Sequence, residues 1–73
     1  MKKFELRQAL TNMKPFAEEF KIGEWAIKYT GADFGIRAIN NESNPYTDYC
    51  AYTWGIKLKQ VIDFLINKGL CEA

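Results

Sequence analysis

The first twenty positions of the chain place apolar residues at helical spacing. The apolar series consists of Leu6, Leu10, Met13, Ala17 and Phe20. Successive members are four, three, four and three positions apart, so a helix would carry them on one stripe. The opening segment is therefore predicted to be helical.

Pro15 interrupts this stripe. Proline has no N–H to donate, and its ring disfavours helical dihedrals at the preceding Lys14. The helix therefore either kinks or restarts at Pro15. We favour a restart, with Pro15 as the first helical residue and Glu18 and Glu19 in the first turns, where carboxylates suit the helix dipole. Gly23 would then end the second helix in a left-handed conformation.

The apolar spacing changes to two after residue 24, which is typical of half-buried strands. Residues 25–29 alternate apolar and small or polar side chains, residues 30–33 have the composition of a turn, and residues 34–39 alternate again. The pattern predicts a hairpin. Turn-forming residues then fill positions 40–45.

The segment that follows is rich in Tyr, Thr and Trp, which suit a pleated surface better than a helix. It predicts a third strand around Asp48 to Thr53. Helical spacing returns at Leu58, Val61, Ile62 and Leu65, and the helix is expected to end where Gly69 follows Lys68 and Leu70 folds back on its last turn.

These elements predict one small α+β domain covering residues 1–73. Their order is α-β-β-β-α, with a three-stranded antiparallel meander packed against an N-terminal helix, interrupted at Pro15, and a C-terminal helix. The chain is 48% hydrophobic and 15% aromatic, which is enough apolar surface to fold. A domain of 73 residues buries a small core, so homodimerisation stays open.

The charge and hydropathy patterns limit the classes of partner that the sequence indicates. Ten Lys and Arg residues nearly balance nine Asp and Glu residues, and no block of like charge marks a nucleic-acid arm. No stretch approaches the roughly 20 apolar residues that span a bilayer, and the opening residues lack a signal-peptide run. We expect a cytoplasmic protein with no membrane partner. Abundant Lys, Ile, Asn, Phe and Tyr suggest AT-rich coding, hence a bacterial or phage source.

Catalytic chemistry has few candidate residues. The chain has no histidine, the commonest general base and metal ligand. Cys50 and Cys71 are far apart without a CxxC pair, so neither a metal site nor a required disulfide is predicted. No phosphate-binding glycine motif is present. We expect no enzyme activity, no catalytic residues and no cofactor.

The strongest candidate site is an aromatic run after the polar loop. It consists of Tyr46, Asp48, Tyr49, Tyr52 and Trp54. Tyr and Trp combine large rigid apolar area with a polar group, which is why they dominate binding hot spots. Some of these rings are also needed to fill the core of so small a domain. We predict that this run binds a protein or nucleoprotein partner, in the manner of a small stoichiometric inhibitor or adaptor.

An alternative site lies at the start of the last helix. Lys57 and Lys59 in the segment GIKLKQ oppose the helix dipole there, and free N–H groups with two lysines would suit a phosphate. The order of elements resembles that of double-stranded-RNA-binding domains, in which lysines at the start of the second helix contact phosphates. The resemblance implies nucleic-acid backbone binding by Lys57 and Lys59. The TGADFG turn and the near-neutral charge depart from that family.

Overall fold

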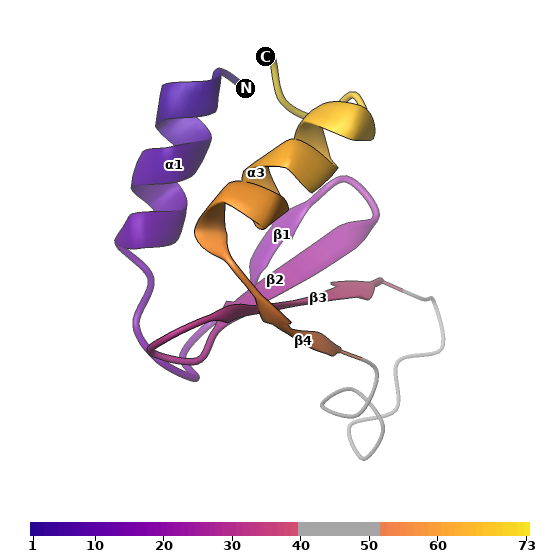
Figure 1. Ribbon diagram of the computed structural model, residues 1–73. Helices are drawn as coiled ribbons and strands as arrows, with labels where there is room; N and C mark the ends of the chain where they lie inside the picture. The colour runs from indigo at the N-terminus through magenta and orange to yellow at the C-terminus, as the bar shows by residue number, and fades with distance from the viewer. Residues whose placement is uncertain (40–51) are drawn as a thin grey trace.

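The computed structural model describes residues 1–39 and 52–73. Within these ranges, two helices cover one face of a four-stranded antiparallel sheet (Figure 1). The elements are α1 (Lys3–Thr11), β1 (Phe20–Ile22), β2 (Trp25–Tyr29), β3 (Phe34–Ala38), β4 (Thr53–Ile56) and α3 (Leu58–Asn67). The strands lie in the sheet in chain order, as a meander. The predicted α+β fold class is confirmed.

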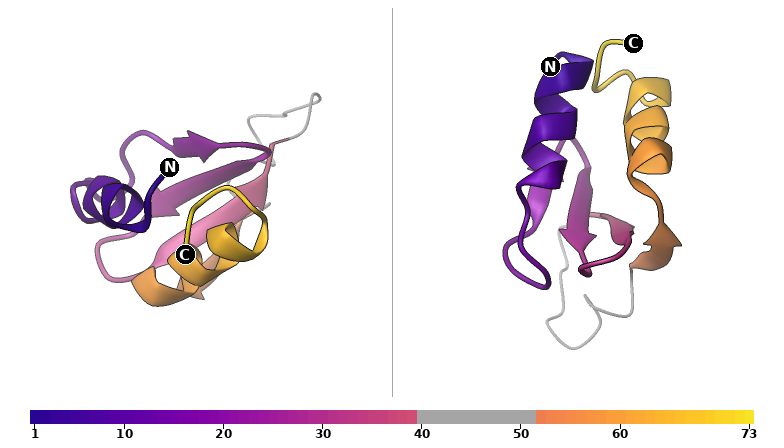
Figure 2. Two further views of the ribbon diagram at one scale, coloured as in Figure 1. Left: turned by 90° about the horizontal axis from the view of Figure 1, so that it is seen from above. Right: turned by 60° about the vertical axis from the view of Figure 1, so that its left-hand side comes forward.

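The hydrophobic core lies between the helices and the sheet, and the views in Figure 2 place both helices on the same side of the strands. Its fully or almost fully buried members come from α1, β2, β3 and α3: Leu6, Leu10, Ile27, Phe34, Ile36, Val61, Ile62 and Leu65. The α3 stripe and the first half of the α1 stripe are therefore as the spacing predicts.

The predicted second helix after Pro15 does not form. Residues 12–19 are irregular, and the end of the supposed stripe, Phe20, begins strand β1. Phe16 adopts a left-handed backbone conformation (φ 54°) that breaks any helix, and its N–H donates to the Tyr29 carbonyl at 2.8 Å. Ala17 is exposed rather than part of an apolar layer. The sheet thus gains a fourth strand that the spacing assigned to a helix.

Strand β1 forms because it pairs with β2 in a tight hairpin. Phe20 lies opposite Ile27 and Ile22 opposite Trp25, so both β1 apolar side chains pack against the core. Gly23 and the next residue make the two-residue turn, with Gly23 at φ +58°. Gly23 therefore ends a strand and not a helix.

The C-terminal part follows the predicted pattern more closely. The third predicted strand lies partly outside the described residues; the strand observed, β4, begins at Thr53. Helix α3 ends as expected, with Leu70 N–H donating to the Leu65 carbonyl and Gly69 N–H to the Ile66 carbonyl, both at 3.0 Å. Cys71, although only two residues from the end of the sequence, is buried and belongs to the core cluster.

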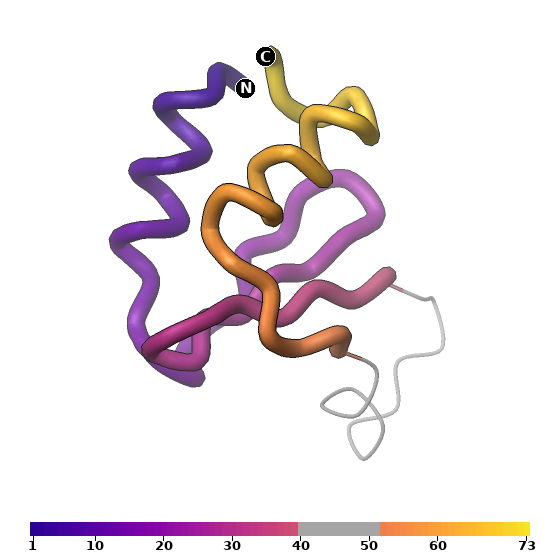
Figure 3. The backbone as a smooth tube through the Cα atoms, viewed as in Figure 1, coloured from indigo at the N-terminus to yellow at the C-terminus, as the bar shows by residue number. Residues whose placement is uncertain are grey.

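The two ends of the chain lie side by side above the helices (Figure 3). The Glu72 N–H donates to the Met1 carbonyl at 2.9 Å. This contact joins the start of α1 to the segment after α3, so the helical layer is connected at its top as well as through side-chain packing.

Candidate functional site

The sheet has a second face that no described helix covers, and we call it the open face. Alternation along the strands assigns to it the positions that face away from the core: Lys21, Ala26, Lys28, Gly35, Arg37, Tyr52 and Trp54. Phe16 and Glu19, from the irregular segment 12–19, lie along its border. The open face therefore collects aromatic and charged residues from both halves of the chain.

Two of the predicted partner-binding residues are described, and both belong to the open face. Tyr52 directly precedes β4, Trp54 lies within it, and their rings stack with centroids 4.7 Å apart and planes at 28°. Tyr52 is only 7% exposed, whereas Trp54 is half-buried. Tyr52 therefore supports the surface, and Trp54 contributes to it. The other three predicted residues, Tyr46, Asp48 and Tyr49, lie outside the described residues.

The stacked pair lies directly on Gly35 of β3. A Cβ added to Gly35 would be 2.5 Å from Cε3 of Trp54, closer than real Cβ atoms come, and 3.0 Å from Cδ1 of Tyr52, which is tighter than most real contacts. The pairing of β3 with β4 shifts register opposite Gly35, where Gly55 has φ +81°, as in a β-bulge. Because Gly35 has no side chain, the indole can lie directly against the backbone of β3.

An acidic side chain ties the border segment to the aromatic pair. Glu19 Oε2 accepts hydrogen bonds from Arg37 Nε at 3.1 Å and from the Tyr52 hydroxyl at 2.5 Å, and it lies 3.0 Å from Arg37 Nη2. The Arg37 guanidinium also lies over the Tyr52 ring, with Cζ 5.6 Å from the centroid. One carboxylate therefore holds three segments of the chain in place, and Glu19 is not the helix-dipole residue that its position beside Glu18 suggested.

The protonation states of this cluster follow from its contacts. Burial opposes ionisation of Glu19, but the hydrogen bond from Tyr52 and the charge of Arg37 outweigh it, so the pKa of Glu19 lies below its usual 4.5. Burial and the hydrogen bond to Glu19 raise the pKa of Tyr52 well above its usual 10. At neutral pH the cluster therefore contains an ionised carboxylate and a protonated tyrosine, which is a stable structural arrangement.

Phe16 presents an exposed ring beside Trp54. It is 54% exposed, and its ring centroid lies 6.3 Å from that of Trp54 with the planes tilted by 50°. The preceding Pro15 lies near Gly31 of the β2–β3 turn, where an added Cβ would be 3.5 Å from Pro15 Cγ. With the bond from Phe16 N–H to Tyr29, these contacts fix the segment that carries the ring.

The alternative phosphate site is altered by an ion pair. Lys57 is the N-cap residue of α3, and its Nζ lies 2.6 Å from Asp33 Oδ1. The Lys57 N–H donates to the Gln60 side-chain oxygen at 2.8 Å, so part of the helix N-terminus is satisfied within the chain. Lys59 is exposed in the first turn of α3. Lys57 is therefore held by Asp33, and Lys59 alone does not supply the pair of lysines that the predicted phosphate site requires.

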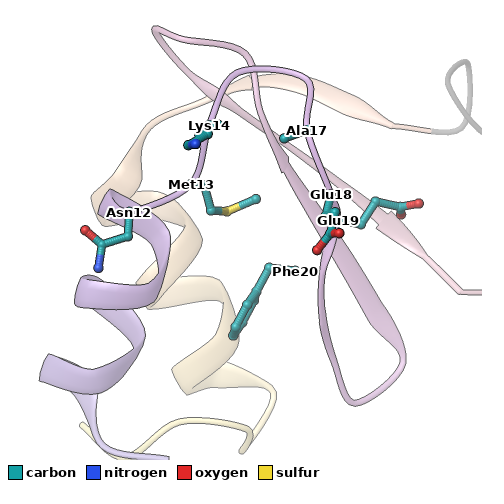
Figure 4. A pocket seen from close by; sticks show the side chains of 7 residues that line it. All are labelled: Asn12, Met13, Lys14, Ala17, Glu18, Glu19 and Phe20. Atoms are coloured by element: carbon teal, nitrogen blue, oxygen red, sulfur yellow. The ribbon is translucent and has the colours of Figure 1, made fainter.

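A hollow of about 460 Å³ lies under the segment 12–19. Figure 4 shows Met13 and Phe20 projecting into the space below this segment, with Lys14 at its rim. An apolar floor with a mixed-charge rim suits a side chain of a bound partner.

Among residues 1–39 and 52–73, no group of three or more acidic or cysteine side chains converges as a metal site would require. No helix in the same ranges is long and apolar enough to cross a membrane.

Most residues of the open face and its border were not predicted as site residues, among them Phe16, Glu19 and Arg37. Arg37 was placed by alternation on the side of its strand opposite Phe34 and Ile36, and that signal is correct. Phe16 and Glu19 were assigned to a helix, so their position beside the sheet had no signal in the spacing. Their role depends on the path of the segment 12–19.

Comparisons of the chain with protein-family models, with curated proteins and with solved structures find no match.

Proposed function

We propose that the protein is a non-catalytic binding module that holds a protein partner stoichiometrically through Phe16 and Trp54 on the open face. An inhibitor or adaptor, as encoded by bacteria and their phages, would act in this way. The exposed ring of Phe16 in a left-handed backbone conformation is the observation that carries the proposal.

Stability does not explain Phe16. A left-handed conformation costs a residue with a Cβ roughly 1–2 kcal/mol, and glycine or asparagine adopts it more easily. A ring that is 54% exposed gains little burial in return. Unfavourable backbone conformations in folded proteins cluster at functional sites, where a side chain must be presented in one orientation. An exposed aromatic ring beside Trp54 is the kind of anchor that dominates protein interfaces.

The conversion Phe16→Asn separates binding from folding. Asparagine tolerates the left-handed conformation, and this gain offsets the lost contact with Trp54. We expect an unfolding free energy within about 1 kcal/mol of the wild type, measured by urea denaturation. In affinity capture from a bacterial lysate, we expect the partner held by the wild type to be lost.

Phe4→Asn is the matched control. Phe4 is 64% exposed on α1, which lies on the other side of the sheet. This variant should retain the same captured protein as the wild type. Retention of that protein by Phe16→Asn, or its equal loss from both variants, would contradict the proposal.

Phosphate binding at the start of α3 is the weaker alternative. Its two lysines differ in environment, because Lys57 is ion-paired with Asp33 while Lys59 is exposed. In titrations of labelled double-stranded RNA at low salt, the fluorescence anisotropy with Lys57→Ala or Lys59→Ala should be the same as with the wild type. A clear loss in both variants, with a reduced salt dependence, would favour the alternative over the open face.

A further inference from the structure

The charged side chains of the open face are unevenly distributed. Among residues 1–39 and 52–73, three cationic residues, Lys21, Lys28 and Arg37, share this face with one acidic residue, Glu19. Glu19 is committed to Arg37 and Tyr52 by the contacts described above. The charge of Lys28 also contributes to the lowered pKa of Glu19, but among the described residues neither Lys28 nor Lys21 forms an ion pair.

Those lysines lie next to the aromatic surface. Lys28 is opposite Gly35 in the β2–β3 pairing, and its Nζ is 6.0 Å from the centroid of the Tyr52 ring. Lys21 is exposed opposite Ala26, one position along the same face. Trp54 lies over Gly35, the residue paired with Lys28, so the indole and the Lys28 ammonium lie in one row across the strands. Apolar and cationic contacts are thus available to one extended ligand.

We infer that the partner presents an acidic segment in which Asp or Glu residues stand beside an aromatic or aliphatic residue. This inference rests on the proposed function and names the chemistry of its partner. The apolar side chain packs against Phe16 and Trp54, and the carboxylates lie near Lys28 and Lys21. Opposite charges across an interface increase the association rate and fix the register of the bound segment.

The aromatic geometry favours a peptide over a single-stranded nucleic acid. Successive bases stack on open aromatic planes. Here the Tyr52 ring is almost fully buried and is covered by Trp54, and Phe16 is tilted by 50° from the indole plane. Trp54 and Phe16 therefore form an angular apolar surface, which fits a branched or aromatic side chain better than two stacked bases.

The inference is tested by selecting from a displayed library of random peptides, about 12 residues long, on the immobilised protein. We expect enrichment of peptides that combine Asp or Glu with an aromatic or aliphatic residue. A synthetic copy of the best peptide should bind more weakly as salt rises, because exposed charges are screened. It should also lose affinity for the Phe16→Asn variant.

Charge reversal provides the decisive variant. The double substitution Lys21→Glu with Lys28→Glu should weaken the selected peptide by about tenfold or more, as repulsion replaces two attractions. A new selection on this variant should enrich Lys or Arg in place of Asp and Glu. The control, Lys2→Glu with Lys3→Glu, makes the same change in net charge at the start of α1 and should leave peptide binding intact.

Each other outcome overturns the inference in a distinguishable way. Peptides that depend on Phe16 but carry no acidic bias would refute the inference and leave the proposed function standing. Failure to select any peptide that depends on Phe16 would refute both. If both double variants lowered the affinity for the peptide equally, the cause would be the net charge of the protein and not a site formed by Lys21 and Lys28. Tighter binding of a 20-nucleotide oligothymidylate than of any selected peptide, lost in Phe16→Asn, would assign the surface to nucleic acid.

Discussion

Replacing Gly35 by valine is expected to destabilise the protein by about 2–3 kcal/mol, because the new side chain must displace the stacked rings of Trp54 and Tyr52. The added Cβ alone would be 2.5 Å from Cε3 of the indole, so the indole or the backbone of β3 has to shift to accommodate it. Urea denaturation measures the loss of stability. Near-UV circular dichroism should show an altered aromatic signal, and partner binding should fall with it.

A valine in the neighbouring strand is the control for this result. Thr53→Val in β4 introduces the same side chain at an exposed position of the same sheet, so its effect should stay within about 0.5 kcal/mol. A Gly35→Val protein that unfolds at the urea concentration of the wild type would mean that the rings do not lie on residue 35 in solution.

Glu19→Gln is expected to cost about 1–3 kcal/mol at pH 7, because the nearly buried Arg37 side chain loses its carboxylate and Tyr52 loses an ionised acceptor. The effect should depend on pH. The pKa of Glu19 is lowered in the folded protein, so its ionised form contributes stability above the usual value of 4.5. That contribution is lost as the pH falls through the lower folded-state pKa.

The difference in stability between the wild type and Glu19→Gln should therefore be constant from pH 6 to 8 and shrink below about pH 4.5. Chemical denaturation at a series of pH values measures it. Glu18→Gln is the matched control, since Glu18 is the adjacent exposed residue and its replacement should change the stability only slightly. A Glu19→Gln difference that persists unchanged at pH 3 would rule out the ionised carboxylate as the cause.

The sequence predicted the elements in which the periodic pattern of apolar residues extends over several positions. Helix α3 and its C-terminal hydrogen bonds, the first half of the α1 stripe, and the β2–β3 hairpin all appear where spacing placed them. Each of these elements buries one face, so the alternation of apolar and polar residues marks it directly. The same alternation correctly placed Arg37 on the side away from the helices.

The segment 12–22 was predicted wrongly because two periodicities overlap there. Ala17 and Phe20 continue the helical spacing of α1, while Phe20 and Ile22 also fit a strand. Three residues of alternation are too short to decide between them. Pairing with β2 decides in favour of the strand, since it satisfies the backbone of β1 and buries both apolar side chains.

The candidate site was predictable only in part for a related reason. Composition singled out Tyr52 and Trp54 as aromatic residues beside a strand, but it could not distinguish the supporting ring from the exposed one. That distinction depends on Gly35, which admits the indole, and on Glu19, which binds the Tyr52 hydroxyl from 33 positions away. Strand register brings these residues together, and no local pattern records register.

By itself, the sequence determined an α+β domain and the core-facing residues of its longer elements. It also contains an aromatic run and no histidine. Only the tertiary structure decided that Phe16, Glu19, Arg37 and Trp54 share one face of the sheet. The physical reason is that periodicity indicates which side of a helix or strand packs against the core. Which residues from distant parts of the chain come together on the open face is decided by strand pairing and by the path of an irregular segment.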